Sequence, residues 1–388
     1  MMLKTLSTLA VIAAVLMLVT VFLAQQQEPG SPPAGKPVFP ELKAAINDVT
    51  HLNVMTQSGT LTVYRDADTW RVKEKYDYPA DHGTVRETLI GLVELKILDP
   101  KTRKPELYEK LGLQDVDAEG SLSTAVTLKD ATGNILADVI IGNDRPAKGK
   151  SGYKEMFIRK AGDPQTWLVE GRLSMEKNPG EWLDKELVQI ETKRIRRLRV
   201  IHPDDTRLVL EKAKPADLDY HVVNLPEEQE IQSQFTVNNV VSTVASLSLD
   251  DVKPRSEIPF GEQAVVAAVF ETFDGLEGRV KLLRKDEKHY VQISATFNAD
   301  LIWKSVPEEE PAPEQDSEPQ ADGQTESEAQ GGEDADKAEK PKIKPEAEVK
   351  VEIETLNKRV AEWVYVIPQF RADAILKKPE DLIKKPNS

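Results

Sequence analysis

Two stretches of the chain repeat one order of hydrophobic and polar positions. The first, residues 46–98, opens with two apolar, β-prone runs joined by a turn. It continues through Trp70 and Pro79 and ends in a segment of helical periodicity at 85–98. The second stretch, residues 195–249, follows the same order. We therefore expect the chain to contain one structural unit twice.

An offset of 152 residues superimposes the helical segments of the two stretches. Their apolar positions are spaced i, i+4, i+7 and i+10, which places them on one face of a helix. The positions of the first segment fall on those of the second, Val85, Leu89, Leu92 and Leu95 on Val237, Val241, Val244 and Leu247. A repeat of about 150 residues is too long for a solenoid and matches a whole domain.

Unit one is predicted over residues 42–190. After the helical segment the pattern indicates a short helical turn ended by Gly112. Four strands, a polar loop and a closing helix begun after Pro179 are expected in the order 125–128, 136–141, loop 142–152, 156–158, 167–169 and 179–187.

Unit two is predicted over residues 191–388. Its strands at 265–270, 280–283 and 290–293 correspond to those of unit one, and the pattern resumes at 349–353 and 363–367. Strands that follow one another through short turns favour antiparallel pairing. The fold class expected is therefore α+β, with two similar tandem domains of short antiparallel strands and helices.

A low-complexity tract interrupts unit two at residues 307–344. Between Pro307 and Pro341, 13 Asp and Glu stand against two Lys, a net charge of −11 within a chain total of −15. The remainder of the chain thus carries only −4. We expect this insertion to be disordered. Two roles stay open for this insertion. It is either a surface loop that increases solubility or a segment that attracts a basic partner or loosely holds divalent cations.

The N-terminal residues 5–24 are uncharged and mostly apolar. Twenty helical residues at about 1.5 Å each span the ~30 Å hydrocarbon core of a membrane. The pattern predicts one transmembrane helix, kept as an anchor. A cleaved signal peptide is the alternative, disfavoured because a cut after Ala24 would put Phe22 at the −3 position, where a small residue is required.

The charges around this span predict its orientation. Lys4 lies in the four-residue stub at 1–4 and Glu28 is the first charge beyond the span, so the N-terminus is expected in the cytoplasm. Residues 25–41, rich in Gln, Pro and Gly, are predicted to be a flexible linker. The localisation expected is the bacterial inner membrane, single-pass, with the C-terminal bulk in the periplasm.

Composition excludes several classes of function. No basic stripe with interleaved aromatics is present, which disfavours a nucleic-acid partner. The longest basic cluster, residues 193–197, is interpreted as the solvated edge of a strand, with phosphate binding as the alternative. Cysteine is absent, so the chain has no disulfide, thiolate zinc site or thiol nucleophile.

The ordered motifs resemble the bacterial family catalogued as domain of unknown function 4340. The resemblance rests on Tyr78-Pro-Ala-Asp81, Tyr108-Glu-Lys-Leu-Gly-Leu113, Ile140-Ile-Gly142, Trp167-Leu-Val169 and Trp182-Leu183. It covers most of residues 46–383, and the second copy departs, with Tyr220 in place of Trp70. The resemblance implies an envelope protein with tandem copies on a membrane anchor, in some lineages similar to auxiliary components of gliding-type ABC transport systems. It implies no catalytic residue.

Candidate chemistry is sparse. No histidine has a second one at i+3 or i+4, and residues 202–205, His-Pro-Asp-Asp, are interpreted as a turn and not a metal cluster. The calcium-like start at Asp66-Ala-Asp68 and the phosphate-loop-like 149–151 both lack the rest of their motifs. The carboxylates Asp250-Asp251 suit a solvated turn. The tryptophans favour core packing over an exposed binding face. No catalytic, cofactor or metal residue is therefore predicted.

These observations lead to a non-enzymatic, membrane-anchored periplasmic binding or accessory protein of an envelope complex. The partners expected are the inner membrane, through residues 5–24, and subunits of an ABC-type transporter or other envelope proteins. A cell-wall-associated scaffold is one alternative. A hydrolase of an envelope polymer is another, and it would need carboxylates converging in a cleft.

Overall fold

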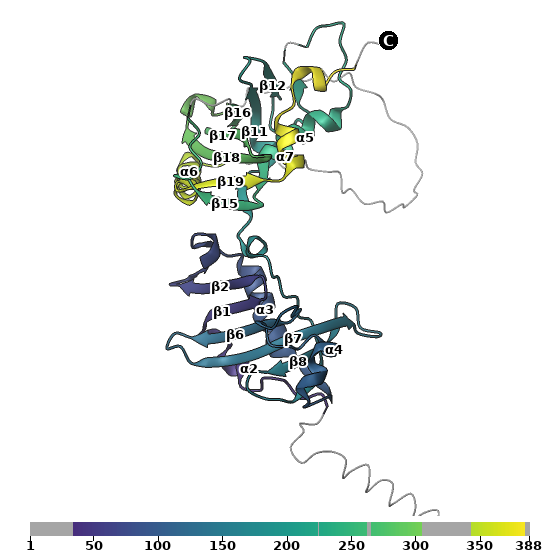
Figure 1. The fold of residues 1–388 in the computed structure, drawn as a ribbon. Helices are drawn as coiled ribbons and strands as arrows, with labels where there is room; N and C mark the ends of the chain where they lie inside the picture. Colours follow the sequence, from purple (N-terminus) through teal and green to yellow (C-terminus); the bar gives the residue numbers. More distant parts are fainter. Residues whose placement is uncertain (1–33, 224, 262–264, 305–342, 385–388) are drawn as a thin grey trace, which may run out of the picture. The chain divides into compact units, whose positions relative to one another are not determined.

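The computed structural model describes residues 34–223, 225–261, 265–304 and 343–384 (Figure 1). They form two compact units that meet in the sequence between Asp184 and Lys185. This division falls a few residues before the predicted one at 190/191, because the strand at 186–189 pairs with a strand of the second unit. The protein is α+β in the broad sense, mostly antiparallel sheets with some helices.

The sheet of unit one has nine antiparallel strands in the order β4-β3-β2-β1-β6-β7-β8-β9-β5. The strands are β1 Val49–Thr56, β2 Gly59–Asp66, β3 Thr69–Val72, β4 Tyr78–Pro79, β5 Lys96–Pro100, β6 Thr124–Asp130, β7 Ile135–Pro146, β8 Lys154–Lys160 and β9 Thr166–Gly171. Alternating residues of β1 and β2, including Leu52, Val54 and Val63, are almost wholly buried, so one face of this sheet forms the core.

The main helix of unit one is α3, His82–Glu94. It begins at Asp81, whose side chain accepts a hydrogen bond from the Thr84 backbone N–H at 2.7 Å. Its apolar stripe buries Val85 and Leu92. The short helical elements are α2 Leu42–Ala45, η1 Ile46–Asp48, η2 Lys73–Lys75, η3 Pro105–Leu107, α4 Tyr108–Leu111 and η4 Pro179–Trp182. Gly112, at φ +68°, ends α4 as predicted.

The sheet of unit two has eight antiparallel strands in the order β13-β12-β11-β16-β17-β18-β19-β15. They are β11 Ile195–Ile201, β12 Arg207–Glu211, β13 His221–Val222, β15 Asp251–Pro254, β16 Val265–Thr272, β17 Leu276–Lys285, β18 Lys288–Phe297 and β19 Trp363–Ile367. A separate two-stranded sheet pairs β10 Glu186–Gln189 with β14 Ser246–Ser248.

The helices of unit two are α5 Gln234–Ala245, α6 Glu346–Val360 and α7 Gln369–Ile375 (Figure 1). Ser233 caps α5 through the Thr236 N–H. Helix α6 packs on β18, and α5 packs on α7. The short helical elements are η5 Thr192–Arg194, η6 Ala299–Leu301 and η7 Pro379–Asp381.

Apart from the short strands at one edge, the two large sheets have the same strand order. In unit one, β2-β1-β6-β7-β8-β9-β5 are neighbours, and in unit two β12-β11-β16-β17-β18-β19-β15 follow the same sequence of connections. Each first strand also carries a register shift at its start, between Val49 and His51 and between Ile195 and Arg197. Equal β-bulges in equal places indicate equal local geometry.

Three expectations for unit one are wrong in detail. The helical segment ends at Glu94, since residues 96–100 instead form β5 and pair with β9. The supposed loop at 142–152 begins later, because β7 runs on to Pro146 through a bulge and is held to β8 by cross-strand ion pairs. The helix after Pro179 is only the 3-10 turn η4, and Leu187 lies in β10.

The predicted anchor at 5–24, the stub at 1–4 and most of the linker at 25–41 lie outside the described residues. So does most of the acidic insertion at 307–344. In the part of the chain that the structure covers, no helix is both long and apolar enough to cross a membrane.

Candidate functional site

The outer face of the unit-two sheet carries charged and polar side chains from β11, β16, β17 and β18. The strand register aligns Arg199, Val269, Arg279 and Ser294 in one row across the four strands. The neighbouring row is Arg197, Glu271, Glu277 and Thr296. Partners in an antiparallel ladder point to the same side, so these side chains share one surface. We call this surface the open face.

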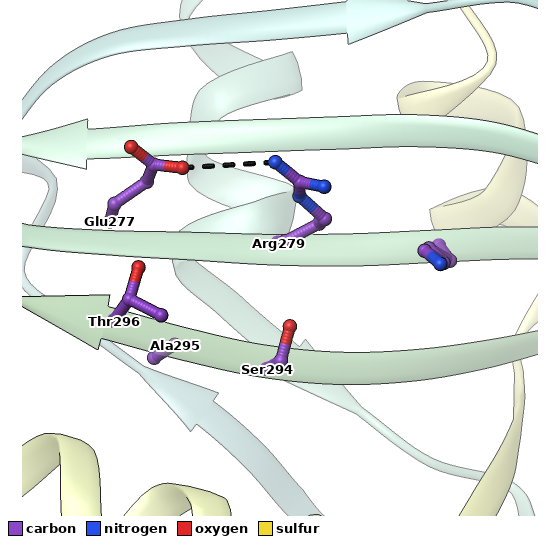
Figure 2. Close-up of a pocket in the computed structure, with 6 residues that line it drawn as sticks. Glu277, Arg279, Ser294, Ala295 and Thr296 are labelled. Carbon is purple, nitrogen blue, oxygen red and sulfur yellow. Dashed lines mark ion pairs between the residues drawn. The ribbon is translucent and has the colours of Figure 1, made fainter.

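A small apolar cluster covers only one end of this side of the sheet. Ile258 and Phe260, from the connection after β15, pack on Leu283, Tyr290 and strand β19. Beyond them lies a shallow hollow of about 310 Å³ over β17 and β18. Figure 2 shows the side chains that line it, from the acidic end at Glu277 to the serine and threonine of β18, Glu277, Arg279, Lys281, Ser294, Ala295 and Thr296.

The carboxylates of the open face are all engaged with arginines. Glu271, whose side chain is only 6% exposed, pairs with Arg199 at 2.5 Å and with Arg197 at 3.5 Å. Glu211 pairs with Arg197 at 2.8 Å. Glu277 lies 3.8 Å from Arg279, a looser contact.

The arginine side chains remain partly exposed to solvent although they form these ion pairs. The side chain of Arg279 is 50% exposed and that of Arg199 is 40% exposed. Lys281, Ser294 and Thr296 are exposed and stand beside them. This surface therefore presents hydrogen-bond donors and positive charge to a ligand, within a protein whose net charge is −15.

The interpretation of residues 193–197 as a solvated strand edge is wrong. Strand β11 is an inner strand, paired with β12 on one side and β16 on the other. A charged side chain is accommodated on this inner strand because Arg197 forms ion pairs with carboxylates of both neighbouring strands, Glu211 and Glu271. Lys193, which pairs with Glu191, lies on the surface with its side chain 61% exposed.

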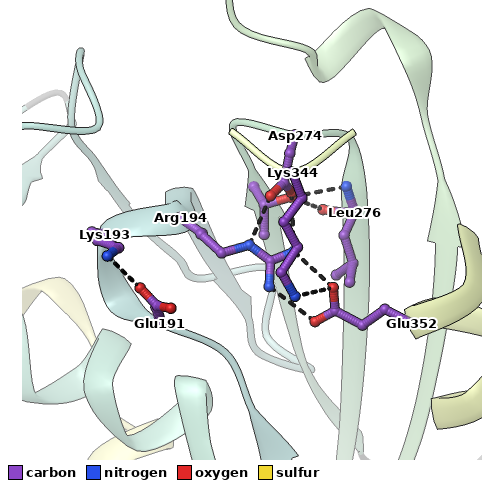
Figure 3. A network of polar contacts seen from close by, with 8 residues as sticks. Glu191, Lys193, Arg194, Asp274, Leu276, Lys344 and Glu352 are labelled. Carbon is purple, nitrogen blue, oxygen red and sulfur yellow. Dashed lines mark hydrogen bonds and ion pairs between the residues drawn. The ribbon is translucent and has the colours of Figure 1, made fainter. Parts of the chain in front are cut away.

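Arg194 lies in the centre of a buried ion network (Figure 3). Its guanidinium donates to Asp274 at 2.7 Å and to both carboxylate oxygens of Glu352 at 2.9 Å. Lys344 reaches the same Glu352 at 2.9 Å. Thr272 donates to Asp274 at 2.6 Å. We call Arg194, Asp274, Glu352 and Lys344 the Arg194 cluster.

The pKa values of this cluster follow from its geometry. Burial lowers the pKa of Arg194, but the hydrogen bonds to Glu352 and Asp274 outweigh burial and raise it. Burial likewise raises the pKa of Glu352, and the bonds from Arg194 and Lys344 reverse the balance and lower it. Arg194 and Glu352 are therefore both charged at neutral pH, and through Arg194 the cluster fastens α6 to the turn between β16 and β17.

Asn357 of α6 completes the edge of β18. Strand β19 pairs with β18 only at residues 289–291. At Ala295, further along, the Asn357 side chain accepts from the backbone N–H at 2.9 Å and donates to the backbone carbonyl at 2.7 Å. The amide thus replaces one residue of a missing neighbouring strand.

The remaining residues weighed from sequence lie apart from the open face. The 202–205 segment is a turn between β11 and β12, as predicted, with Asp205 at φ +61°. Trp70, Trp167 and Trp182 are buried, so core packing is confirmed for these three. Among the described residues, no group of three or more His, Asp or Glu could hold a metal ion.

Sequence reasoning did not single out the open face, although one indication was present. Strand β17 alternates Glu277, Arg279 and Lys281 with apolar or glycine positions, which is the pattern of a sheet with one wet face. The Arg194 cluster had no such indication, since its members lie 80 and 158 positions apart.

Comparison with known proteins gives one match. A family model described as "Domain of unknown function (DUF4340)" matches residues 70–260, from β3 of unit one to the segment after β15 of unit two. The comparisons with curated proteins and with solved structures found no match.

Proposed function

The chain belongs to the DUF4340 family through residues 70–260, and from this premise we propose a membrane-anchored binding protein of the bacterial envelope. Residues 5–24 would span the inner membrane and leave two similar tandem domains in the periplasm. The protein would serve as a non-enzymatic accessory of an envelope complex, with the subunits of an ABC-type transporter as partners. Two domains behind a tether raise the effective concentration of whatever they bind near the membrane.

The open face carries this proposal. It is a ladder of side chains on four strands, so its donors are held in fixed positions at little cost in conformational entropy. Arg199, Arg279 and Lys281 would meet acidic or polar groups of the partner. Charge complementarity of this kind mainly raises the association rate and the specificity.

The same face argues against a hydrolase. Hydrolysis by two carboxylates needs one protonated acid and one free carboxylate beside the substrate. Glu211, Glu271 and Glu277 each form an ion pair with an arginine, so carboxylates that a hydrolase would aim at its substrate are engaged within the protein. Binding is the function that this arrangement supports.

The test is co-purification from gently solubilised, crosslinked membranes. The wild-type chain is compared with the double variant Arg199→Glu/Arg279→Glu and with a control of equal charge change on unit one, Arg65→Glu/Arg145→Glu. We expect the wild type and the control to recover an ATPase and its membrane subunit in stoichiometric amount. The open-face variant should lose about tenfold or more of that recovery.

Two outcomes would overturn the proposal. Recovery of the chain alone would end the transporter assignment, and binding of that chain to isolated cell wall would then favour the scaffold. Equal loss in both double variants would show that net charge matters and the open face does not.

A deletion of residues 307–341, which keeps Lys344 in the Arg194 cluster, tests whether the acidic insertion contributes to docking.

A further inference from the structure

A second hollow lies on unit one, whereas the open face belongs to unit two. Its volume is about 510 Å³, and it is formed by the segment from η3 to Ala118 together with the turn after β8. Its lining combines Arg159, Tyr108 and Asp115 with small apolar side chains from Pro105, Ala118 and Pro164. A charged group with apolar surroundings is the usual composition of a small-ligand site.

Arg159 is nearly buried in this hollow, with 9% of its surface exposed. Its guanidinium carbon lies 4.7 Å from the centre of the Tyr108 ring. The ring is fixed in turn, because the Tyr108 hydroxyl donates to the Pro164 carbonyl at 2.7 Å. A planar cation held against an aromatic face keeps its edge available for hydrogen bonds.

The hydrogen bonds of Arg159 are incomplete. Nη2 donates to one oxygen of Asp115 at 2.5 Å and to the Leu113 carbonyl at 3.4 Å. Nε is shut off from solvent and has no acceptor among the described residues. The Asp115 side chain, by contrast, is 71% exposed, so it can leave Arg159 without being buried elsewhere.

We propose that this hollow binds a carboxylate group at the end of a small ligand or peptide, and that Asp115 occupies its place when no ligand is present. A carboxylate accepts two parallel bonds from an arginine, whereas Asp115 accepts one. The incoming group would take Nη2 from Asp115, and its second oxygen would accept from Nη1 beside it, because the hydrogen bonds of Arg159 to Asp115 and Leu113 use Nη2 alone. The apolar part of the ligand would lie on Pro105, Ala118 and Pro164.

Asp163 limits the strength of this site. It also lines the hollow, and its carboxylate accepts from the Gln165 backbone N–H at 2.9 Å. A second negative charge near Arg159 opposes any anion. Binding of a lone carboxylate is therefore expected to be weak, and contacts of the ligand's apolar part with Pro105, Ala118 and Pro164 would add to it.

The experiment uses the full chain in detergent and measures binding of N-acetylalanine by saturation-transfer difference NMR. The methyl ester of the same compound, which lacks the negative charge, is the matched probe. We expect the acid to bind and the ester to fail. Asp115→Ala should tighten binding of the acid by about threefold to tenfold, because the internal competitor is gone. Asp117→Ala, an exposed carboxylate in the same loop, should leave it unchanged.

Other results would overturn the proposal. If the ester binds as well as the acid, the carboxylate is not what is recognised. If Asp115→Ala lowers the melting temperature without tightening binding, or if no variant binds, the Arg159–Asp115 pair is only a structural tie. Arg159→Gln should abolish binding, and Asp115→Ala keeps the test decisive if that variant does not fold. The site shares no residue with the open face, so either proposal can fail alone.

Discussion

In unit one the connection from β5 to β6 is long, and in unit two the connection from β15 to β16 is shorter. The long one, residues 101–123, contains η3 and α4 and lays Tyr108 and Leu113 over the middle of its sheet, against Ile140. The shorter one is residues 255–264, and in its described part, 255–261, Ile258 and Phe260 pack at the end near β19. Two sheets of one strand order thus differ in their outer faces, and the shorter connection leaves the charged face open.

The connection from β8 to β9 in unit one corresponds to the connection from β18 to β19 in unit two. Here the connection of unit two is the longer one. In unit one a tight turn joins β8 to β9, and the two strands pair along their whole length. In unit two the acidic insertion and α6 intervene, and β19 pairs with β18 at residues 289–291 only. The Arg194 cluster and Asn357 hold α6 where unit one has continuous strand pairing.

The largest effect is expected at the Arg194 cluster. Arg194→Met leaves Asp274, whose side chain is 1% exposed, without its counter-charge. Removing one partner of a buried ion pair costs about 3–5 kcal/mol. Chemical denaturation should show this loss in the free energy of unfolding. Arg145→Met breaks an exposed pair of unit one and should cost less than about 1 kcal/mol. Equal losses in the two variants would contradict a structural role for the cluster.

The next effect concerns two glycines, one in each unit. A Cβ on Gly142 would lie 2.2 Å from the Leu111 carbonyl oxygen, and a Cβ on Gly278 would lie 2.0 Å from the Phe270 ring. Overpacking of this kind costs about 1–3 kcal/mol, so each Gly→Ala variant should melt at a lower temperature. Gly261→Ala, where a Cβ meets nothing within 4 Å, is the control. If Gly142→Ala melts like the wild type, α4 does not need its close approach to β7.

A smaller effect is expected where α6 replaces strand pairing. Asn357→Ala removes two hydrogen bonds to the backbone of Ala295 and should cost about 1–2 kcal/mol in denaturant unfolding. Asn357→Asp keeps the acceptor and loses the donor, so its loss should be intermediate. The assignment would be contradicted if Asn357→Asp lowered the free energy of unfolding by about 1–2 kcal/mol while Asn357→Ala did not lower it.

The smallest effect is a pH dependence carried by unit two. Burial lowers the pKa of Lys212 to about 8, only partly offset by the attraction of Asp217. The unfolded chain keeps this proton to a pKa of about 10.4, so between these values the unfolded state binds more protons. The free energy of unfolding should therefore rise from pH 7.5 to 9.5, and this rise should vanish in Lys212→Met. Lys160→Met, which removes a lysine over the Phe39 ring of unit one, should retain it.

The fold could be predicted where local pattern and tertiary structure agree. The strand at 363–367 and the helical turn ended by Gly112 follow directly from alternation and from the glycine. Residues 349–353 show where pattern is ambiguous. Val349, Val351 and Ile353 alternate like a strand, yet Val351 is 63% exposed and the segment is helix α6. The burial of Val349, Ile353, Leu356 and Val360 follows the helical period instead.

The candidate sites could be predicted only in part. Alternating charges in β17 indicate a wet face, but its extent depends on where Ile258 and Phe260 pack on the sheet. Arg159 and Asp115 are brought together by α4 packing on β7, which no local pattern contains. Long-range pairs of this kind arise from the register of the whole sheet.

The most direct test of the open face is site-specific photo-crosslinking in intact cells. A photoreactive phenylalanine analogue replaces Ser294 on the open face in one variant and the exposed Thr60 on β2 of unit one in the other. We predict that the Ser294 position yields one crosslinked product with a membrane subunit of an envelope complex and that the Thr60 position does not. The same product from both positions, or none from Ser294, would contradict the assignment of the open face as the binding surface.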